Sequence, residues 1–455
     1  MELNKNIFRA NDIRGIAYQD LNEETIICLG KVLGSLSLEN EQKEFIIGRD
    51  GRNSSPEMFS WLSKGITDAG CNVIDIGIVP SPVLYFATHE LNSSNGVVIT
   101  GSHNPAEYNG FKIIINGKSL LSEEIQEIRV RIENHEFLEG NGSVKSVSIL
   151  KKYQEAVLKN ININRKLRIG IDCGNGAGSV HAKETFSRLG CEVHDLYCEL
   201  DGNFPNHHPD PSKEENLRDL IDLVLKKRLD VGLAFDGDAD RLGVISSSGK
   251  IIYPDMQMIV FSEEILKENP NSKIVFDVKC SNLLGESIKK NTGTPIMCKT
   301  GHTFIKETLR KESAVLGGEM SGHIFFNDKW PGFDDGIYAG ARLLEIISSQ
   351  EEGVDIFDSL PHLFSTPEIN IPSSDEDKFI IVNAFKAACN FPEAEVIDID
   401  GIRLEFPNGW GLLRASNTSP VLVLRFEAKS QNDLDDIKNK FKMVFRNINK
   451  NIKDF

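Results

Sequence analysis

Three stretches of the sequence repeat the same order of features, and this repetition constrains the fold more than any other property. They begin at 45-FIIGRDGRNSS, 168-RIGIDCGNGAGS and 273-KIVFDVKCSN. In each, an apolar segment runs into a polar loop, a helix-length stretch leads to a second apolar segment, and a third apolar segment ends in a polar loop that contains glycine. Strand–helix alternation of this kind predicts βαβ units whose mostly parallel strands are covered on both faces.

The pattern changes after Pro367. A polar run at 372-PSSDEDK precedes strand-like segments at 395-EVIDIDGIRLEF, 409-GWGLLRAS and 420-PVLVLRFEAKS and a helical segment at 431-QNDLDDIKNKFKMVFRNI. A chain of 455 residues is too long for a single hydrophobic core. We therefore expect three similar α/β domains with mixed, mostly parallel sheets and a C-terminal α+β domain, arranged around a central cleft. The expected domain boundaries are 1–147, 148–249, 250–366 and 367–455.

The third apolar segment of each repeat ends in a distinctive loop. These loops read 100-TGSHNP, 235-FDGDADR and 318-GEMSGH. In open α/β sheets, ligands bind beyond the carboxyl ends of the strands. If the three domains face a common centre, the three loops meet there, and they become the first place to look for a functional site.

The loop 236-DGDADR carries three carboxylates, Asp236, Asp238 and Asp240, which alternate along the sequence and would point to one side of an extended segment. Carboxylates that point to one place repel one another unless a cation lies between them, and an all-oxygen set suits Mg²⁺, Mn²⁺ or Ca²⁺. The motif is not a calcium-binding EF-hand loop, because Arg241 replaces the required glycine and Ser247 the required glutamate. A solvated acidic turn is the structural alternative. The position directly after an apolar strand favours the metal site.

Ser102 follows the apolar segment Val97 to Ile99 and stands between a glycine and His103. The GxSxG motif of the α/β-hydrolases is absent here, so a hydrolase triad is not indicated. A serine that only closes a turn is the structural alternative. A phosphorylated Ser102 would instead add nearly two negative charges, which the three aspartates could balance through a metal ion and Lys112 through its ammonium group.

Two further loops carry polar side chains suited to a sugar phosphate, although either loop alone could be a surface turn. Glu319 and Ser321 of 318-GEMSGH could bind sugar hydroxyls, and His323 lies in the same loop. The stretch 414-RASNTS combines Arg414 with hydroxyl groups and backbone N–H groups, which can hold a phosphate without a P-loop. Lone basic residues at other strand ends could line the same cleft: Arg14, Lys279 and His302.

Charge and composition exclude some classes of partner. The formal net charge of −16 argues against binding to nucleic acid or to an anionic membrane surface. No apolar run is long enough to span a bilayer, and the first residues lack the apolar core of a signal peptide. The eight cysteines are scattered without a CxxC pair, which indicates reduced thiols. We therefore expect a cytoplasmic protein that binds a small molecule.

Five motifs, taken in order, resemble those of the α-D-phosphohexomutase family, in particular its bacterial phosphomannomutase/phosphoglucomutase branch. They are 8-FRANDIRG, 100-TGSHNPAEYNGFK, 235-FDGDADR, 318-GEMSGH and 414-RASNTSP, and the resemblance spans the whole chain. It implies four domains, of which the first carries the phosphoserine loop, the second the metal loop, the third the sugar loop and the fourth the phosphate loop. It also implies that Ser102 carries a phosphoryl group next to Mg²⁺ bound by Asp236, Asp238 and Asp240.

The resemblance implies roles for the remaining motif residues as well. Glu319 and Ser321 would contact the sugar hydroxyls O3 and O4. The non-reacting phosphate of the substrate would be held by Arg414, Ser416, Asn417 and Thr418. Acid–base or electrostatic roles would belong to Arg14, Lys112, His302 and His323, with His103, Arg241 and Lys279 nearby in the cleft. The chain departs from the family at Asn11, where many members carry a tyrosine that contacts substrate.

The implied reaction is reversible transfer of a phosphoryl group between O1 and O6 of mannose and glucose phosphates, through a hexose 1,6-bisphosphate that is both intermediate and activator. The enzyme is expected to be a monomer. The alternatives are a phosphoglucosamine or phosphoacetylglucosamine mutase, a sugar-phosphate phosphatase, and a sugar-phosphate-binding protein without activity. The form 318-GEMSGH of the sugar loop favours the phosphomannomutase/phosphoglucomutase type over the amino-sugar mutases.

Overall fold

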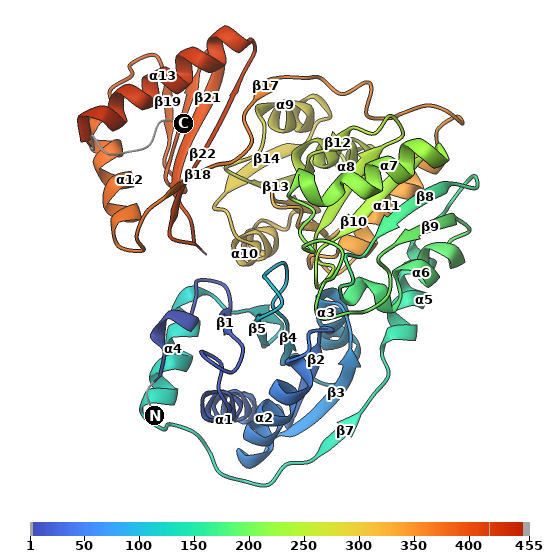
Figure 1. Cartoon of the computed structure of the whole chain (residues 1–455), viewed down its shortest axis with the longest axis vertical. Coiled ribbons are helices and arrows are strands. Elements are labelled where there is room, and N and C mark those ends of the chain that lie inside the picture. The colour runs from blue at the N-terminus through green and yellow to red at the C-terminus, as the bar shows by residue number, and fades with distance from the viewer. Residues whose placement is uncertain (1–2, 418, 449–455) are drawn as a thin grey trace.

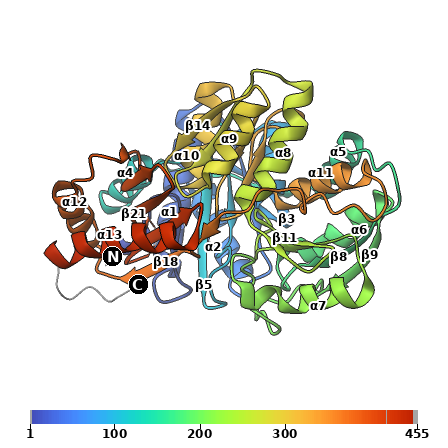
Figure 2. The ribbon, with the colours of Figure 1, turned by 90° about the horizontal axis from the view of Figure 1, so that it is seen from above.

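The computed structural model describes residues 3–417 and 419–448, and these residues form four sheets that follow one another along the chain. We call each sheet with its helices a unit. Figure 1 shows the first unit facing the other three, and in both views the third unit lies between the second and the fourth (Figures 1 and 2). Among the described residues, no helix is both long and apolar enough to cross a membrane.

The first unit is a mixed sheet in the order β1-β5-β4-β2-β3-β7, with β6 added to β5. Its strands are β1 (Ile13–Ile16), β2 (Glu44–Arg49), β3 (Asn72–Ile78), β4 (Gly96–Ile99), β5 (Tyr108–Ile115), β6 (Lys118–Ser119) and β7 (Val144–Ser146). Its helices are η1 (Lys5–Ile7), α1 (Glu23–Glu39), α2 (Ser55–Asp68), α3 (Ser81–Glu90) and α4 (Ser122–Glu133). Strands β3, β2 and β4 run parallel as the repeat predicts, whereas β5 pairs with β4 in the antiparallel direction.

The second unit repeats this plan in the order β12-β11-β10-β8-β9. Its strands are β8 (Arg168–Asp172), β9 (Glu192–Leu196), β10 (Val231–Phe235), β11 (Leu242–Ser246) and β12 (Ile251–Ile252). Its helices are α5 (Leu150–Asn160), η2 (Ala177–Val180), α6 (Ala182–Arg188), η3 (Glu214–Leu217) and α7 (Arg218–Lys227). Strands β9, β8 and β10 are parallel and β11 is antiparallel to β10, so the mixed sheet of the first unit recurs.

The third unit has the order β14-β13-β15-β16, again with one antiparallel strand beside parallel ones. Its strands are β13 (Lys273–Asp277), β14 (Thr294–Cys298), β15 (Leu316–Gly318) and β16 (Ile324–Phe326). Its helices are α8 (Pro254–Glu268), α9 (Asn282–Lys290), α10 (His302–Glu312) and α11 (Gly336–Ser348). The three similar α/β units expected from the repeat are therefore confirmed.

The fourth unit is an antiparallel sheet in the order β17-β22-β21-β20-β19, with β18 also paired to β22. Its strands are β17 (Phe364–Ser365), β18 (Ile369–Pro372), β19 (Glu395–Ile397), β20 (Ile402–Phe406), β21 (Gly409–Ala415) and β22 (Val421–Ala428). Its helices are α12 (Asp377–Ala388) and α13 (Gln431–Ile448), whose apolar residues pack on the sheet around Phe385 and Phe441. The predicted α+β architecture of the C-terminal region is confirmed.

The second and third units share one apolar core, which the repeat pattern does not predict. Helix α11 packs against β10 and β11 of the second sheet as well as against β16 and α8 of its own unit. Across the same boundary, the hydroxyl of Tyr153 in α5 donates to both carboxylate oxygens of Asp335 at 2.9 and 2.8 Å. Asp335 also caps α11, because its side chain accepts the N–H of Tyr338. One buried carboxyl group thus adds a polar link to the apolar contacts between the two units.

We expect the stability of this junction to fall as pH rises. Burial raises the pKa of the Asp335 carboxyl from its ordinary 3.8 to about 7. The folded protein therefore holds a proton that the unfolded chain releases, so the stabilisation is complete below about pH 4 and is lost as pH rises through 7. Between pH 5 and 8 the wild-type protein should lose about 2–3 kcal/mol of stability relative to Asp335→Asn.

Urea denaturation of both proteins at pH 5 and pH 8, followed by tryptophan fluorescence, measures this difference, because Trp330, one of the three tryptophans, packs 5.9 Å from Tyr153, ring centre to ring centre. Asp222→Asn on the exposed side of α7 is the matched control and should follow the wild type at both pH values. A stability difference between wild type and Asp335→Asn that does not change with pH would contradict the assignment.

Candidate active site

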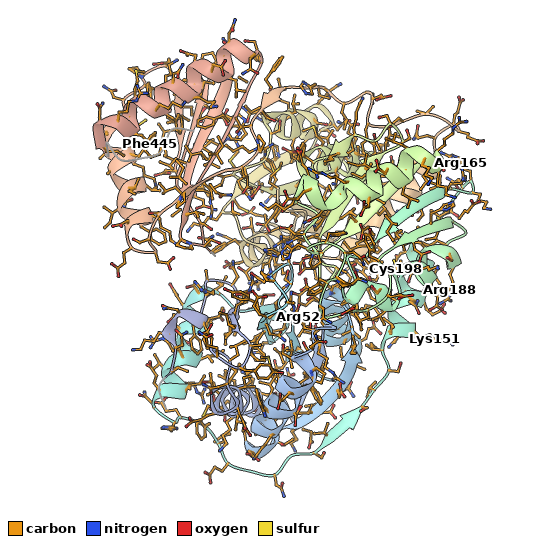
Figure 3. All side chains as sticks on the ribbon, viewed as in Figure 1. Arg52, Lys151, Arg165, Arg188, Cys198 and Phe445 are labelled. Atoms are coloured by element: carbon orange, nitrogen blue, oxygen red, sulfur yellow. The ribbon has the colours of Figure 1, made fainter. Side chains whose placement is uncertain are left out.

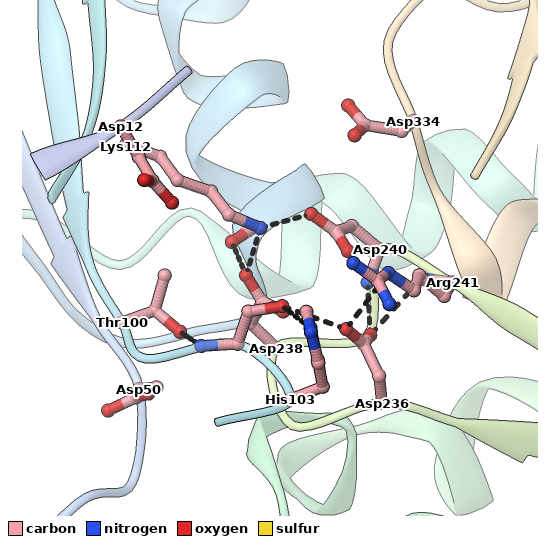
Figure 4. Close-up of polar contacts among 12 residues, drawn as sticks. Asp12, Asp50, Thr100, His103, Lys112, Asp236, Asp238, Asp240, Arg241 and Asp334 are labelled. Carbon is pink, nitrogen blue, oxygen red and sulfur yellow. Dashed lines mark hydrogen bonds and ion pairs between the residues drawn. The ribbon is translucent and has the colours of Figure 1, made fainter. Parts of the chain in front are cut away.

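Ser102 lies at the carboxyl end of β4 and points into the interior, with 2% of its surface exposed. Its backbone is in the left-handed region, with φ of +49°, and its N–H donates to Thr100 Oγ1 at 2.8 Å. This turn directs the hydroxyl towards the second unit, where Ser102 Oγ donates to Asp236 Oδ2 at 3.0 Å (Figure 4). His103 Nδ1 lies 3.3 Å from the same oxygen. The structure thus brings together the serine and the acidic loop that the sequence places 134 residues apart.

Arg52 supports the Ser102 loop through hydrogen bonds to its backbone, and sequence reasoning did not identify this residue. Its side chain is completely buried and pairs with Asp50. Its guanidinium group donates to four backbone carbonyls of the loop, those of Ser102, Asn104, Pro105 and Tyr108. A Cβ atom on Gly101 would lie 2.5 Å from Arg52 Cζ, so the loop can close over the arginine only with glycine there. The available signal was the polar loop 49-RDGR that follows β2, in the position equivalent to other loops of the repeat.

Replacing Arg52 with lysine should lower the kcat of the phosphoryl transfer expected from the sequence by about 100-fold. An ammonium group cannot replace the planar fork of donors with which the guanidinium group binds four carbonyls, and a displacement of about 1 Å at a reacting atom has a cost of this size. Steady-state kinetics and a thermal melt measure the effect. Arg49→Lys is the matched control, since Arg49 pairs with Asp75 and stacks on Phe59 away from Ser102. Normal kcat in a well-folded Arg52→Lys protein would show that the loop does not need this support.

The acidic loop follows β10 as a tight turn rather than the extended segment expected from the alternation of its aspartates. Asp236 Oδ1 accepts the backbone N–H groups of Asp240 and Arg241 at 3.1 and 3.2 Å. Ala239 takes a left-handed conformation, with φ of +56°, and its buried methyl group points towards Gly178. The turn still gathers Asp236, Asp238 and Asp240, and one carboxylate oxygen from each lies within 4.8 Å of the other two. All three side chains are fully buried.

This cluster fits a divalent cation. One oxygen of Asp238 and one of Asp240 are buried without a hydrogen-bond partner, so both are free to act as ligands. Carboxylate oxygens and a hydroxyl form the donor set that hard cations prefer. Burial and the neighbouring Asp238 raise the pKa of Asp236 well above its ordinary value, as expected for acids that repel one another. The three aspartates can therefore hold a metal ion.

Lys112 supplies the positive charge at this cluster from the first unit. Its Nζ donates to Asp238 and to Asp240, and Ser81 donates a further hydrogen bond to Asp238 (Figure 4). Burial opposes charge on Lys112, but the two carboxylates outweigh it and hold the Lys112 pKa above its ordinary value. Burial likewise acts to raise the pKa of Asp238, and the lysine reverses that effect. Residues of the first and second units thus form one charged network.

Two histidines of the third unit lie on the other side of the acidic loop. His302, at the start of α10, stacks on His323 with ring centres 5.3 Å apart. His323 Nε2 accepts from Arg241 Nε at 3.0 Å, while His323 Nδ1 lies 3.0 Å from Asp334 and 3.5 Å from Asp240. Burial, with the charge of Lys306, lowers the pKa of His302 well below its ordinary value, so its imidazole is neutral and able to accept a proton. Sequence reasoning found both histidines and Arg241 but not Asp334 or Lys306.

The sugar loop lies beside these histidines. Glu319 is buried, and its carboxylate accepts the backbone N–H of Gly301 and the hydroxyl of Ser321, the latter at 3.3 Å. Asn11, from the first unit, accepts a hydrogen bond from Thr303 Oγ1 at 2.6 Å, so it contacts the start of α10. Arg14 pairs with Asp12 in the same N-terminal segment.

The phosphate loop of the fourth unit reaches the third unit. Arg414 Nε donates to Asp400 at 2.9 Å, and Asn417 Nδ2 donates to the carbonyl oxygen of Thr300 at 3.0 Å. Ser416 is buried between them in the chain, whereas Thr418, a further predicted phosphate ligand, lies outside the described residues. Lys279 Nζ pairs with Glu368, next to β18, at 2.6 Å. The described candidate residues therefore come from all four units.

Comparison with known proteins identifies the family. Models described as phosphoglucomutase/phosphomannomutase alpha/beta/alpha domains I, II and III match residues 5–139, 151–249 and 253–364, and the C-terminal domain of the same family matches residues 368–443. The chain is 48% identical to a phosphomannomutase/phosphoglucomutase of Pseudomonas aeruginosa over 442 residues, which cover 97% of this chain and 95% of the relative. It is 46% identical to a phosphoglucomutase of Neisseria gonorrhoeae, with 97% of each chain covered.

Solved structures support the same family assignment. A phosphoglucomutase/phosphomannomutase family protein from Burkholderia thailandensis is 40% identical and superimposes with a TM-score of 0.95 over the full length of both chains. An N-acetylphosphoglucosamine mutase of Aspergillus fumigatus shares 15% identity at a TM-score of 0.63, a likeness of fold alone. With all four domain models matched and nearly half of the residues identical over almost the whole length, this chain belongs to the phosphoglucomutase/phosphomannomutase family of α-D-phosphohexomutases.

Proposed function

We propose that this enzyme moves a phosphoryl group reversibly between O1 and O6 of glucose phosphates and mannose phosphates, with Ser102 as the carrier. The observation that carries the proposal is the buried hydroxyl of Ser102 at 3.0 Å from Asp236, within a cluster of three carboxylates that can hold a metal ion. The names of the relatives, phosphomannomutase/phosphoglucomutase and phosphoglucomutase, support the same reaction. Hexose phosphates are the substrates that the family implies.

Asp236, Asp238, Asp240 and an oxygen on Ser102 would hold Mg²⁺, which when bound supplies positive charge next to the phosphoryl group. Residues of the chain position the phosphoryl group and stabilise the charge that develops during its transfer. Arg52 fixes the loop on which the phosphoryl group is carried. Lys112, whose ammonium group contacts two of the acids, and Arg241, which lies 3.7 Å from Asp236, offset charge that develops on Ser102 Oγ.

The transfer needs a group that accepts a proton from the attacking sugar hydroxyl. Neutral His302 can take this proton. Both ring nitrogens of His323 are engaged, Nε2 as the acceptor of Arg241 and Nδ1 next to Asp334, so His323 would serve an electrostatic role beside it. The bond from phosphorus to Ser102 Oγ then breaks as the bond from phosphorus to the sugar oxygen forms, which yields the hexose 1,6-bisphosphate. After the bisphosphate turns end over end, its other phosphoryl group returns to Ser102 by the reverse of these steps.

The remaining predicted residues would orient the sugar. Glu319 and Ser321 would bind O3 and O4, and Arg414, Ser416, Asn417 and Thr418 would hold the phosphate that does not react, with Arg14, His103 and Lys279 nearby. Glucose and mannose differ only at O2, which this arrangement does not contact, so we expect both sugars to react. Asn11, tied to Thr303, would adjust substrate affinity rather than chemistry.

Further parts of the proposal concern the whole molecule. We place the domain boundaries at 1–147, 148–249, 250–366 and 367–455, with the phosphoserine, metal, sugar and phosphate loops in that order. The enzyme acts as a cytoplasmic monomer without a nucleic-acid partner, in keeping with its net charge of −16. Hexose 1,6-bisphosphate serves as activator, because it can load a phosphoryl group onto unmodified Ser102.

A coupled assay with glucose 1-phosphate, mannose 1-phosphate and glucosamine 1-phosphate tests the proposal. We expect turnover of the first two with Mg²⁺ and a trace of hexose 1,6-bisphosphate, and much slower turnover of the amino sugar. Preference for glucosamine 1-phosphate would instead identify an amino-sugar mutase. Stoichiometric release of inorganic phosphate, independent of the bisphosphate, would identify a phosphatase.

A further inference from the structure

Two cysteines lie side by side at the ends of neighbouring parallel strands. Asp172, the last residue of β8, is the register partner of Leu196, the last residue of β9. Cys173 follows Asp172 directly, Cys198 comes two residues after Leu196, and the N–H of Cys173 donates to the carbonyl oxygen of Leu196 at 3.3 Å. The Sγ atom of Cys198 lies 3.2 Å from the Sγ atom of Cys173. Among the described residues, no other pair of cysteine sulfurs forms such a contact.

The two thiols differ in access to solvent. Cys173 is completely buried, whereas Cys198, labelled in Figure 3, is partly exposed and follows β9, the edge strand of the second sheet. A small oxidant therefore reaches Cys198 first and finds Cys173 already in contact behind it. Contact with Cys198, together with burial, raises the pKa of Cys173 well above its ordinary value, so Cys173 remains a thiol until its partner reacts.

We propose that Cys173 and Cys198 are a peroxide-sensitive pair that closes to an intramolecular disulfide and thereby lowers turnover. In the first step, the sulfur of Cys198 attacks a hydroperoxide, the O–O bond breaks, and a sulfenic acid and water are formed when the oxidant is hydrogen peroxide. The sulfur of Cys173 then attacks the sulfur of Cys198, loses its proton, and releases a second water. Two thiols and one hydrogen peroxide give one disulfide and two waters, and a dithiol reductant reverses the change.

Closing the bond brings the two sulfurs to about 2.05 Å and draws Cys198 towards β8. Cys198 begins the segment of the second unit that packs against the first unit. In that segment Gly202 packs against the backbone of Arg52 and Asn53, and the ring centre of Phe204 lies 4.9 Å from the Arg52 guanidinium carbon. Because Arg52 holds four carbonyls of the Ser102 loop, a shift of this segment is transmitted to the reacting hydroxyl.

A second route leads from Cys173 to the acidic loop. A Cβ atom on Gly178 would lie 3.6 Å from Cys173 Sγ and 3.4 Å from the methyl group of Ala239, which stands between Asp238 and Asp240. A displacement of Cys173 would therefore be passed through Gly178 to Ala239 of the metal loop. The formation of the disulfide does not depend on the proposed mutase activity, whereas its effect on turnover rests on that proposal.

The test uses the full-length protein treated with a small excess of hydrogen peroxide. Non-reducing peptide mass spectrometry should find one bond between the peptides that contain Cys173 and Cys198, with two of the eight thiols lost. Mutase turnover should fall at least about threefold and recover after dithiothreitol. Cys198→Ser should form no disulfide and keep its activity in peroxide, while Cys389→Ser, which removes another partly exposed thiol, should behave as the wild type.

The outcomes separate the claims. Loss of thiols without a peptide that joins Cys173 to Cys198 overturns the redox pair, whatever the enzyme's activity. A disulfide that leaves turnover unchanged overturns its coupling to the site. Equal loss of activity in Cys198→Ser would place the oxidation elsewhere and also overturn the coupling. A protein with the disulfide but no mutase activity in either redox state would refute the proposed function and leave the pair itself established.

Discussion

Replacing Ser102 with alanine should reduce mutase turnover by about 10⁴-fold or more, while hexose phosphates still bind. The reason is that Ser102 Oγ is the atom to which the phosphoryl group would be attached, and the three neighbouring acids cannot substitute for it. Binding should persist because the sugar and phosphate loops belong to the third and fourth units. Stopped-time assays of glucose 1-phosphate turnover and calorimetric titration with the same compound measure the two quantities separately.

Ser93→Ala is the matched control for this variant. Ser93 is a buried serine of the same unit, and its hydroxyl donates to the backbone carbonyls of Glu44 and Asn95, away from the acidic loop. The Ser93→Ala variant should lose some stability but keep nearly all of its turnover. If Ser102→Ala retained more than about 1% of wild-type turnover, transfer would not proceed through this hydroxyl.

Removing the charge of Lys112 should destabilise the metal-free protein by about 3–5 kcal/mol, the usual result when one partner of a buried ion pair is lost. The side chain is 5% exposed and contacts Asp238 and Asp240, which together with Asp236 would remain as buried acids without their cation. Mg²⁺ should restore part of this loss in Lys112→Met, because a bound cation replaces the missing charge. Denaturation in EDTA and in excess MgCl₂ measures both effects.

Lys273→Met provides the comparison. Lys273 pairs with Glu312 at 2.7 Å, but it is 42% exposed, so its loss should cost no more than about 1 kcal/mol in either buffer. Lys112→Met as stable as wild type in EDTA would show that Lys112 does not balance the cluster. A large loss that Mg²⁺ fails to reduce would show that the three acids do not hold the ion.

The sequence allowed the meeting of Ser102 with the acidic loop to be predicted, because a general rule connects strand ends with ligand sites. Both lie at carboxyl ends of strands, β4 and β10, in units whose order was visible in the repeat. The rule says which residues converge, but not the local backbone. Asp236, Asp238 and Asp240 were expected along an extended segment and instead share a turn that needs a left-handed residue at Ala239.

Residues that act by supporting others were missed. Arg52 binds backbone carbonyls some 50 residues away. Because every residue has a backbone carbonyl, a sequence motif cannot indicate which of them a side chain will bind. Asp334 reaches His323 from the segment before α11, a distance along the chain that no spacing rule covers. The shared core of the second and third units was hidden for a similar reason. Helix α11 looks like the closing helix of its own repeat, although it also packs on the sheet before it.

The most direct test of the central claim is to locate the phosphoryl group. The protein is incubated with hexose 1,6-bisphosphate labelled with ³²P, with Mg²⁺ or with EDTA, and then digested and mapped. The account predicts label on Ser102 only, formation that requires Mg²⁺, and quantitative transfer of the label to added glucose 1-phosphate. Label on any other residue, or labelling of Ser102 that proceeds equally well in EDTA, would contradict it.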